Sequence, residues 1–238
     1  MIRLGEPIEP SVAEALSSVD TLIHCAHDVR VGALENNVRG SMLIAAAAKG
    51  AGVRRQLFIS SYSAISNAQS EYASAKRRLE EFFRSEGQSI VRPGLVVGRG
   101  GMFLKMFKLV SKSPIVPLLD GGRNTIPIVW IEDLARAVET LLENGKSGEF
   151  NMYSEGPFSL SDVLHAVSQS KGRRTVFVTI PTRWLLPPIR GLESLGIPLP
   201  VSSENLAGYL KIQGTIERSH LKETIGEETP LATMMARL

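Results

Sequence analysis

A tyrosine and a lysine four residues apart, Tyr72 and Lys76, are the side chains of this sequence best suited to acid–base chemistry. The segment from Glu71 to Glu86 has apolar residues at helical spacing and is followed by Gly87, so we expect a helix with both side chains on one face. An ammonium group beside a phenol favours the phenolate and lowers its pKa, as a tyrosine that exchanges protons requires. The pair predicts a tyrosine general acid or base, although this spacing alone also arises by chance on a core-facing helix.

Two serines and an asparagine would complete such a site. Ser60 and Ser61 follow a predicted strand, at the edge where open α/β sheets bind their ligands. A hydroxyl there can hydrogen-bond the substrate oxygen that Tyr72 protonates or deprotonates. Asn37 lies on the predicted helix before that strand. Each feature alone is more often a turn or a helix start, but their joint order along the chain favours one site.

The elements that must position these residues alternate between strand-like and helix-like patterns. This order predicts an α/β fold with a doubly wound, parallel sheet covered by helices. The predicted strands are 21–25, 56–59, 90–92 and 128–131, and the predicted helices are 34–49, 71–86, a helix from about 133 and another opened by a capping box at 159–162. Five prolines between 181 and 200 predict a short helix bracketed by turns.

Composition narrows the classes of protein. The 238 residues are 43% hydrophobic and 21% charged, as in ordinary globular proteins. The formal net charge is +3, without a basic stripe interleaved with aromatics, which argues against a nucleic-acid partner. No apolar run reaches membrane-spanning length and no signal peptide is recognisable, so we expect no membrane association and a cytoplasmic protein. The single cysteine, Cys25, fits a reducing compartment.

The sequence contains one short cluster of metal-ligand types, His24-Cys25-Ala26-His27. Along a strand the two histidines would point to opposite faces, so they could not bind one metal ion together. We therefore expect no metal site.

Six segments, in this order, resemble motifs of the extended short-chain dehydrogenase/reductase superfamily, of its NAD-dependent epimerase/dehydratase kind. They are Thr21–His27 (similar to D-x-V-I-H-x-A-A), Asn37-x-x-Gly40-Ser41, Leu57–Ser61, Tyr72 with Lys76, Ile90–Gly98 (similar to I-I-R-P-x-x-V-Y-G) and Val129–Ala135 (similar to V-H-V-x-D-L-A). The similarity runs from about Val19 to Ser154.

The resemblance implies a Rossmann-like fold and an NAD or NADP cofactor. It implies hydride transfer at a hydroxyl or carbonyl carbon of a sugar-like, possibly nucleotide-sugar, substrate. By position, Ser61 would bind the substrate oxygen, Tyr72 would be the acid or base, and Lys76 would hold the nicotinamide ribose. The residues that would line the cofactor are Ala26, Asn37, Ser60, Tyr72, Lys76, Pro93 and Gly94.

The sequence departs from the family pattern at two places. No Gly-x-x-Gly-x-x-Gly turn precedes Val19, so we expect a Rossmann-like core without its first strand, turn and helix. The strand at 21–25 would then lie at a sheet edge and favour self-association or a homodimer. Seven positions before Asp133, where many nucleotide-sugar epimerases have an arginine, the chain has Ile126, and the nearest arginine is Arg123.

These patterns predict two parts and leave two alternatives open. We expect residues 1–110 and 125–145 to form the cofactor-binding core, and residues 111–124 and 146–238 the substrate-binding part. The alternatives to an enzyme are a non-catalytic binding or scaffolding protein that keeps the fold, and a fragment completed by another chain. The substrate, the reaction direction and the choice between NAD and NADP do not follow from the residues.

Overall fold

The computed structural model describes residues 10–28, 30, 32–65, 70–156, 158–172, 174–195, 203 and 217–238, with the backbone alone at 10, 11, 13 and 185. The first nine residues, and Pro198 and Pro200 of the proline-rich stretch, lie outside these ranges. The chain forms two compact units. The first contains the described residues up to Arg92 and Leu141–Phe150, and the second contains Pro93–Thr140 and those from Asn151 onward. The assignment of cofactor and substrate roles to parts of the chain stays a prediction.

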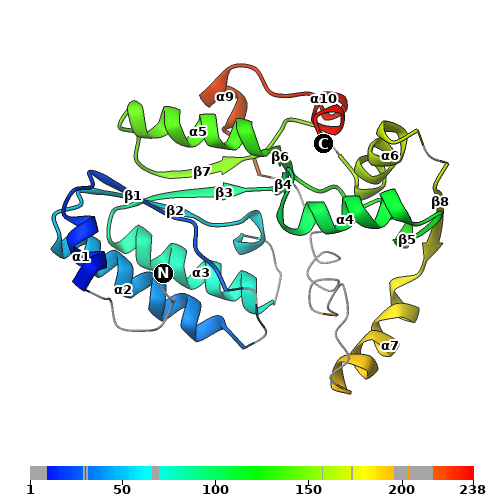
Figure 1. The fold of residues 1–238 in the computed structure, drawn as a ribbon, viewed down its shortest axis with the longest axis horizontal. Helices are drawn as coiled ribbons and strands as arrows, with labels where there is room; N and C mark the ends of the chain where they lie inside the picture. The colour runs from blue at the N-terminus through cyan, green and yellow to red at the C-terminus, as the bar shows by residue number, and fades with distance from the viewer. Residues whose placement is uncertain are drawn as a thin grey trace. The chain divides into compact units, whose positions relative to one another are not determined.

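A four-stranded sheet organises the first unit (Figure 1). Its order is β1 (Thr21–His24), β2 (Arg55–Ile59), β3 (Ser89–Pro93) and β7 (Glu149–Met152). The pairs β1–β2 and β2–β3 are parallel, with Thr21 opposite Arg55 and Leu57 opposite Ser89. Strands β1, β2 and β3 match the predicted ones to within a residue at either end, whereas β7 was not predicted. Among the described strands β1 lies at one edge, as expected, while self-association through that edge stays a prediction.

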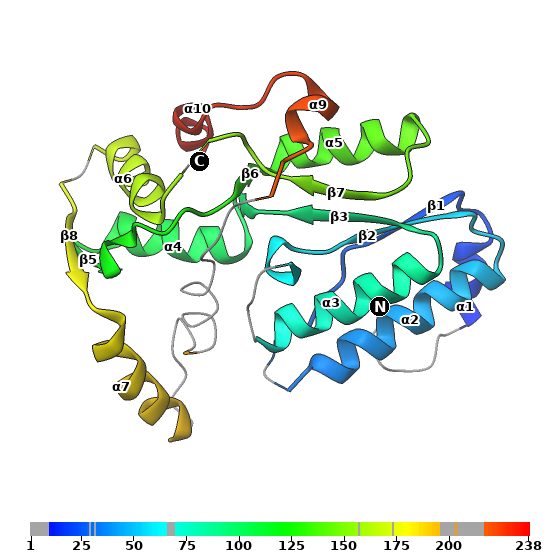
Figure 2. The ribbon, with the colours of Figure 1, turned by 180° about the vertical axis from the view of Figure 1, so that it is seen from behind.

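Three helices of the first unit lie on the same side of this sheet (Figures 1 and 2). They are α1 (Pro10–Leu16), α2 (Leu34–Gly50) and α3 (Glu71–Ser85). The Ser70 side chain caps α3 by accepting a hydrogen bond from the Ala73 N–H at 3.0 Å, and Gly87, at φ 68°, follows its end. The core under these helices is apolar, with Phe58 of β2 stacked on Phe83 of α3 at 4.8 Å.

The second unit has two smaller parallel pairs of strands. β4 (Leu95–Val97) pairs with β6 (Ile128–Trp130), and β5 (Ile115–Leu119) pairs with β8 (Val176–Ile180). Its helices are α4 (Gly101–Lys112), α6 (Leu160–Ser170), α7 (Thr182–Ser194), α9 (Leu221–Ile225) and α10 (Leu231–Ala236), and α5 (Ile131–Glu143) runs from this unit into the first. The predicted capping box is present at the start of α6.

Helix α7 differs from the prediction. The prolines predict a short helix bracketed by turns, whereas α7 is 13 residues long and contains Pro187 and Pro188. No described helix is long and apolar enough to cross a membrane.

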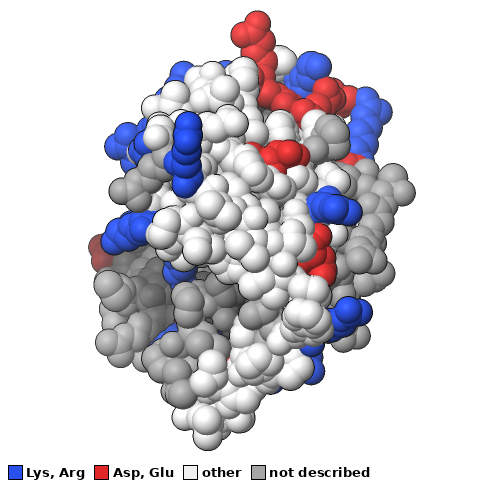
Figure 3. Space-filling view, turned by 90° about the vertical axis from the view of Figure 1, so that its right-hand side faces the viewer, with Lys and Arg blue, Asp and Glu red and all other residues white. Residues whose placement is uncertain are grey.

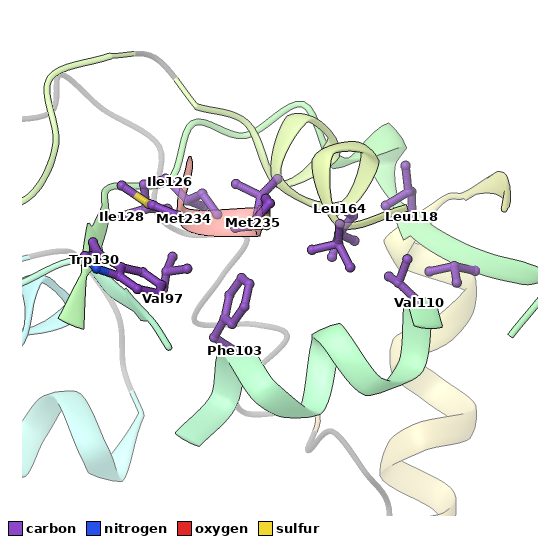
Figure 4. Packing of buried hydrophobic residues seen from close by; sticks show 13 residues of the cluster. Val97, Phe103, Val110, Leu118, Ile126, Ile128, Trp130, Leu164, Met234 and Met235 are labelled. Carbon is purple, nitrogen blue, oxygen red and sulfur yellow. The ribbon is translucent and has the colours of Figure 1, made fainter. Parts of the chain in front are cut away.

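The core of the second unit joins α4, α6 and α10 to the short strands. Phe103, Val110, Leu164 and Met234 converge in it (Figure 4). The end of the unit that carries β8 and α7 also exposes apolar side chains, with Trp184 at 66% exposure, and Figure 3 shows few charged atoms in the middle of that face.

Candidate active site

The structure places Tyr72 and Lys76 together in the first two turns of α3. The Lys76 ammonium lies 5.7 Å from the centre of the Tyr72 ring and 4.7 Å from that of Phe58. Tyr72 keeps 38% of its surface exposed, whereas Lys76 is 3% exposed. The helix therefore presents a ring that a ligand can reach above a cation that is shielded from water.

Lys76 is held at the carboxyl end of β2. Its Nζ donates a hydrogen bond to the Ile59 carbonyl at 2.7 Å. Burial lowers the pKa of Lys76 to about 8, and the nearby Cys25 and Glu80 partly oppose this shift. Lys76 is thus a buried ammonium that is mostly charged at neutral pH and close to its titration range.

The hydroxyl partner of Tyr72 is Ser61. Their hydrogen bond lowers the pKa of Tyr72, but the protein atoms packed around the tyrosine raise it by a larger amount. The sequence predicts that Lys76 lowers this pKa, and the structure differs. The Lys76 ammonium is directed to the Ile59 carbonyl, and the net shift of the tyrosine is upward. In this arrangement Tyr72 is a protonated phenol at neutral pH.

The two neighbouring serines have different surroundings. Ser61 begins the short 3-10 helix η1 (Tyr62–Ala64), where its Oγ accepts hydrogen bonds from the N–H and the hydroxyl of Ser63, at 3.2 and 2.9 Å. Ser60 is 2% exposed, and its hydroxyl donates to the Glu80 carboxylate at 2.5 Å. Ser61 is therefore on the Tyr72 side of the strand end and Ser60 on the interior side. A cofactor contact of Ser60 stays a prediction.

Asn37 fixes the loop that follows β1. Its amide nitrogen donates to the Asp28 carbonyl at 2.8 Å, and its Oδ1 accepts from the Asp28 N–H at 2.7 Å. Asn37 is 3% exposed, so both bonds are largely shielded from water. Its first function in the fold is to hold this loop in place.

That loop carries a histidine that the sequence analysis did not assign to the site. The His27 ring contacts Tyr72 edge to face, with 4.8 Å between centres and 84° between planes. Its Nδ1 is buried and has no hydrogen-bond partner in the described part of the chain. Burial, aided by the charge of Lys76 and opposed by Asp28, lowers the pKa of His27 to about 4. The available signal was that His27 occupies the last alanine position of the family motif H-x-A-A.

His24 has different partners from His27. Its Nε2 lies 2.8 Å from the Gln56 Oε1, and its ring packs on Phe83. Among the described residues no group of three or more His, Cys, Asp or Glu side chains could hold a metal ion.

The remaining residues expected at the cofactor, Ala26, Pro93 and Gly94, lie on other segments of the chain. Ala26 is exposed in the loop after β1. Pro93 and Gly94 belong to the second unit, where the Gly94 N–H donates to the Met152 carbonyl at 3.2 Å. A Cβ on Gly94 would lie 2.4 Å from the Pro127 carbonyl oxygen, so close backbone packing alone requires this glycine.

A nicotinamide dinucleotide fits part of this arrangement. An ammonium has three N–H donors, and within the described ranges Lys76 uses one of them, at Ile59, so two remain for ribose hydroxyls. The glycine-rich segment 98–101 does join β4 to α4, but the place of a third glycine is taken by the fully buried Phe103. The described residues thus offer a cation with two further N–H donors, but not the usual pyrophosphate-binding turn.

A family model, described as the NAD dependent epimerase/dehydratase family, matches residues 8–154. Two curated proteins are similar to the chain. A ceramide reductase of Caulobacter vibrioides is 26% identical over 70% of the chain and 55% of its own length. The mitochondrial 40 kDa subunit of NADH-ubiquinone oxidoreductase of Neurospora crassa is 28% identical over 70% of the chain and 44% of its own length. The chain thus spans about half the length of the curated relatives it matches.

Among solved structures, a triphenylmethane reductase of Citrobacter sp. complexed with NADP(H) has a TM-score of 0.70 and 19% identity. The match covers 98% of the chain and 81% of that structure. At this identity the match bears on the fold alone, and it confirms the predicted α/β, Rossmann-like class.

Proposed function

Because the chain belongs to the NAD-dependent epimerase/dehydratase family, we propose that it supports hydride transfer at a hydroxyl or carbonyl carbon, with Tyr72 exchanging the proton of the substrate oxygen. The family is the one that the six sequence segments resemble, and its cofactor is of the expected NAD or NADP type. The observation that carries the proposal is the cluster of Ser61, Tyr72 and Lys76 in one unit, with Tyr72 open to a ligand.

The three residues have separable roles in this proposal. Ser61 orients the substrate oxygen toward the phenol that it already contacts. Tyr72, whose pKa burial raises, is a protonated phenol and donates its proton as the oxygen gains negative charge. Lys76 holds the ribose hydroxyls with its two remaining N–H groups, and its charge stabilises the phenolate after the proton has left. NAD(P), when bound, supplies or accepts the hydride.

The substrate class follows less directly. We propose a sugar-like hydroxyl or carbonyl compound, as expected from the family. A diphosphate anchor at the usual position is missing, because Ile126 there is 4% exposed and part of the second unit's core. This residue makes a nucleotide sugar a weaker choice than a substrate without a diphosphate.

A second candidate is a non-catalytic role as a binding or scaffolding protein. The similarity to a subunit of NADH-ubiquinone oxidoreductase favours it, since a subunit acts within a larger assembly. The two candidates differ in one respect: only the enzyme needs the Tyr72 proton.

Calorimetric titration of the chain with NAD(H) and NADP(H), followed by turnover assays with sugar and ketone substrates, tests the proposal. Tyr72→Phe should leave cofactor affinity within about twofold and lower the rate about 10²–10⁴-fold. Tyr153→Phe is the matched control, because it removes a phenol oxygen that hydrogen-bonds the Glu217 carbonyl in the second unit. Cofactor binding without turnover in the unaltered chain would favour the non-catalytic candidate. Equal rates for Tyr72→Phe and the unaltered chain would refute the role of Tyr72.

A further inference from the structure

A buried carboxylate, that of Glu80, lies one helical turn beyond Lys76 on α3. It accepts three hydrogen bonds, from the Ser60 hydroxyl at 2.5 Å and from Nε and Nη2 of Arg92 at 2.8 and 2.6 Å. All three residues are at most 7% exposed. The carboxylate thus joins the end of β2, the middle of α3 and β3.

The position of this carboxylate relates it directly to the candidate active site. Ser60 stands between Ile59, whose carbonyl binds Lys76, and Ser61, which binds Tyr72. The Ser60 hydrogen bond therefore ties the strand end that carries Ser61 to the helix that carries Tyr72 and Lys76. The Ser60 N–H also donates to the Val91 carbonyl at 2.7 Å, which fixes the same point to β3.

Stability alone does not account for these buried charges. Removing charged groups from water is costly, and well-packed apolar side chains of similar volume are often at least as stabilising. Arg92 also pairs with Glu149, which in turn pairs with the half-exposed Arg84. A bidentate Arg92–Glu80 pair would be complete without Ser60. The third hydrogen bond is the one directed toward the active site.

The charge of Glu80 also acts on Lys76. It favours the protonated ammonium and so opposes the effect of burial. The other titratable groups that influence or contact Lys76 are Cys25 and His27, which follow β1, and Tyr72 on its own helix. Of these, Cys25 acts in the same direction as Glu80 and has the larger effect.

We propose that Glu80 is a positioning residue, which holds Ser61 against Tyr72 through Ser60 and keeps Lys76 protonated through its negative charge. The inference rests on the proposed function for its catalytic meaning. The Ser60–Glu80 hydrogen bond and the effect of the Glu80 charge on Lys76 involve residues of the first unit and can be measured without turnover.

Two variants separate the two effects. Glu80→Gln keeps the shape and an acceptor for Ser60 but removes the charge, and Ser60→Ala keeps the charge but removes the hydrogen bond. The readout is the titration of Lys76 in the full chain, followed by NMR of side-chain-labelled lysine. We expect its midpoint to move to lower pH in Glu80→Gln. The matched control is Glu149→Gln. It removes the other carboxylate that pairs with Arg92, and Glu149 has no contact with Ser60 or Lys76 in the described structure. In this variant the Lys76 midpoint should not move.

Cofactor binding and rate complete the test. At about pH 8, where Lys76 titrates, Glu80→Gln should bind NAD(P)(H) at least about threefold more weakly than the unaltered chain. Ser60→Ala should lower kcat by about tenfold while KM for the cofactor stays nearly constant. A Lys76 midpoint unchanged in Glu80→Gln, or shifted as far in Glu149→Gln, would overturn the inference.

Two outcomes that could confuse the result are separable. If Glu80→Gln does not fold because Arg92 loses a partner, Glu80→Gln combined with Arg92→Gln removes both charges and is expected to show a smaller Lys76 shift in the same direction. If the unaltered chain binds no cofactor, the proposed function fails, yet the Lys76 titration still decides the role of Glu80.

Discussion

Acid sensitivity caused by His27 is the prediction that the structure quantifies best. Burial first, and then the charge of Lys76, lower its pKa to about 4, whereas the ordinary value is 6.5. Between these two values the unfolded chain binds more protons than the folded chain, so the free energy of unfolding falls as the pH falls. From about pH 7 to about pH 5 the loss that His27 alone contributes is about 2 kcal/mol.

The assay compares urea unfolding of the chain and of His27→Asn at these two pH values. The variant lacks the titrating ring, so its stability should fall by about 2 kcal/mol less on acidification. His24, whose pKa burial also lowers, is present in both proteins and cancels in the difference. Equal pH dependence of the two proteins would refute the reasoning.

A histidine NMR titration tests the stated causes of the His27 shift. Removing the positive charge with Lys76→Met should raise the His27 midpoint. Removing the negative charge with Asp28→Asn should lower it, since the two charges act in opposite directions on the imidazolium. Shifts of the same sign in both variants would contradict the assignment of these charges.

Two further substitutions test how the fold supports the site. Asn37→Ala should cost about 1–3 kcal/mol, because the backbone N–H and C=O of the loop after β1 lose their partners. The measurement is hydrogen exchange of that loop, which should be faster in Asn37→Ala. The control is Asn36→Ala at the exposed neighbour, which should leave the exchange unchanged. Gly94→Ala should lower stability by about 1–3 kcal/mol or more, because its Cβ would meet the Pro127 carbonyl at 2.4 Å. Thermal unfolding of Gly94→Ala is compared with that of Gly100→Ala, whose Cβ would meet nothing within 4 Å. Equal melting temperatures of the two variants would contradict the prediction.

The parts of the fold that local patterns encode were predictable. Helix α3 has a serine cap, apolar residues at helical spacing and a glycine stop, and its predicted and observed bounds differ by one residue. The short strand β7 (Glu149–Met152) and the β5–β8 pair were not predicted. They have few residues each, β5 contains Pro117, and strand pairing between distant segments defines them.

The same distinction holds within the candidate site. The proximity of Tyr72 and Lys76 follows from helical geometry, so their spacing in the sequence was enough to predict it. The contact of His27 with Tyr72, and the hydrogen bond of Ser60 with Glu80, join segments far apart in the chain. No local period encodes such contacts. The net upward shift of the Tyr72 pKa was missed as well, because burial in the folded chain causes it.

Helix α3 shows how these features depend on each other. Tyr72, Lys76 and Glu80 follow one another at intervals of four residues, and exposure falls from 38% at Tyr72 to 3% and 4% at the two charged residues. Two opposite charges on the buried face of an amphipathic helix conflict with simple hydrophobic patterning, and such conflicts are expected at functional sites. Here the conflict has a chemical reason. Under the proposed function the lysine serves the tyrosine only while it remains protonated, and Cys25 and Glu80 both favour this state.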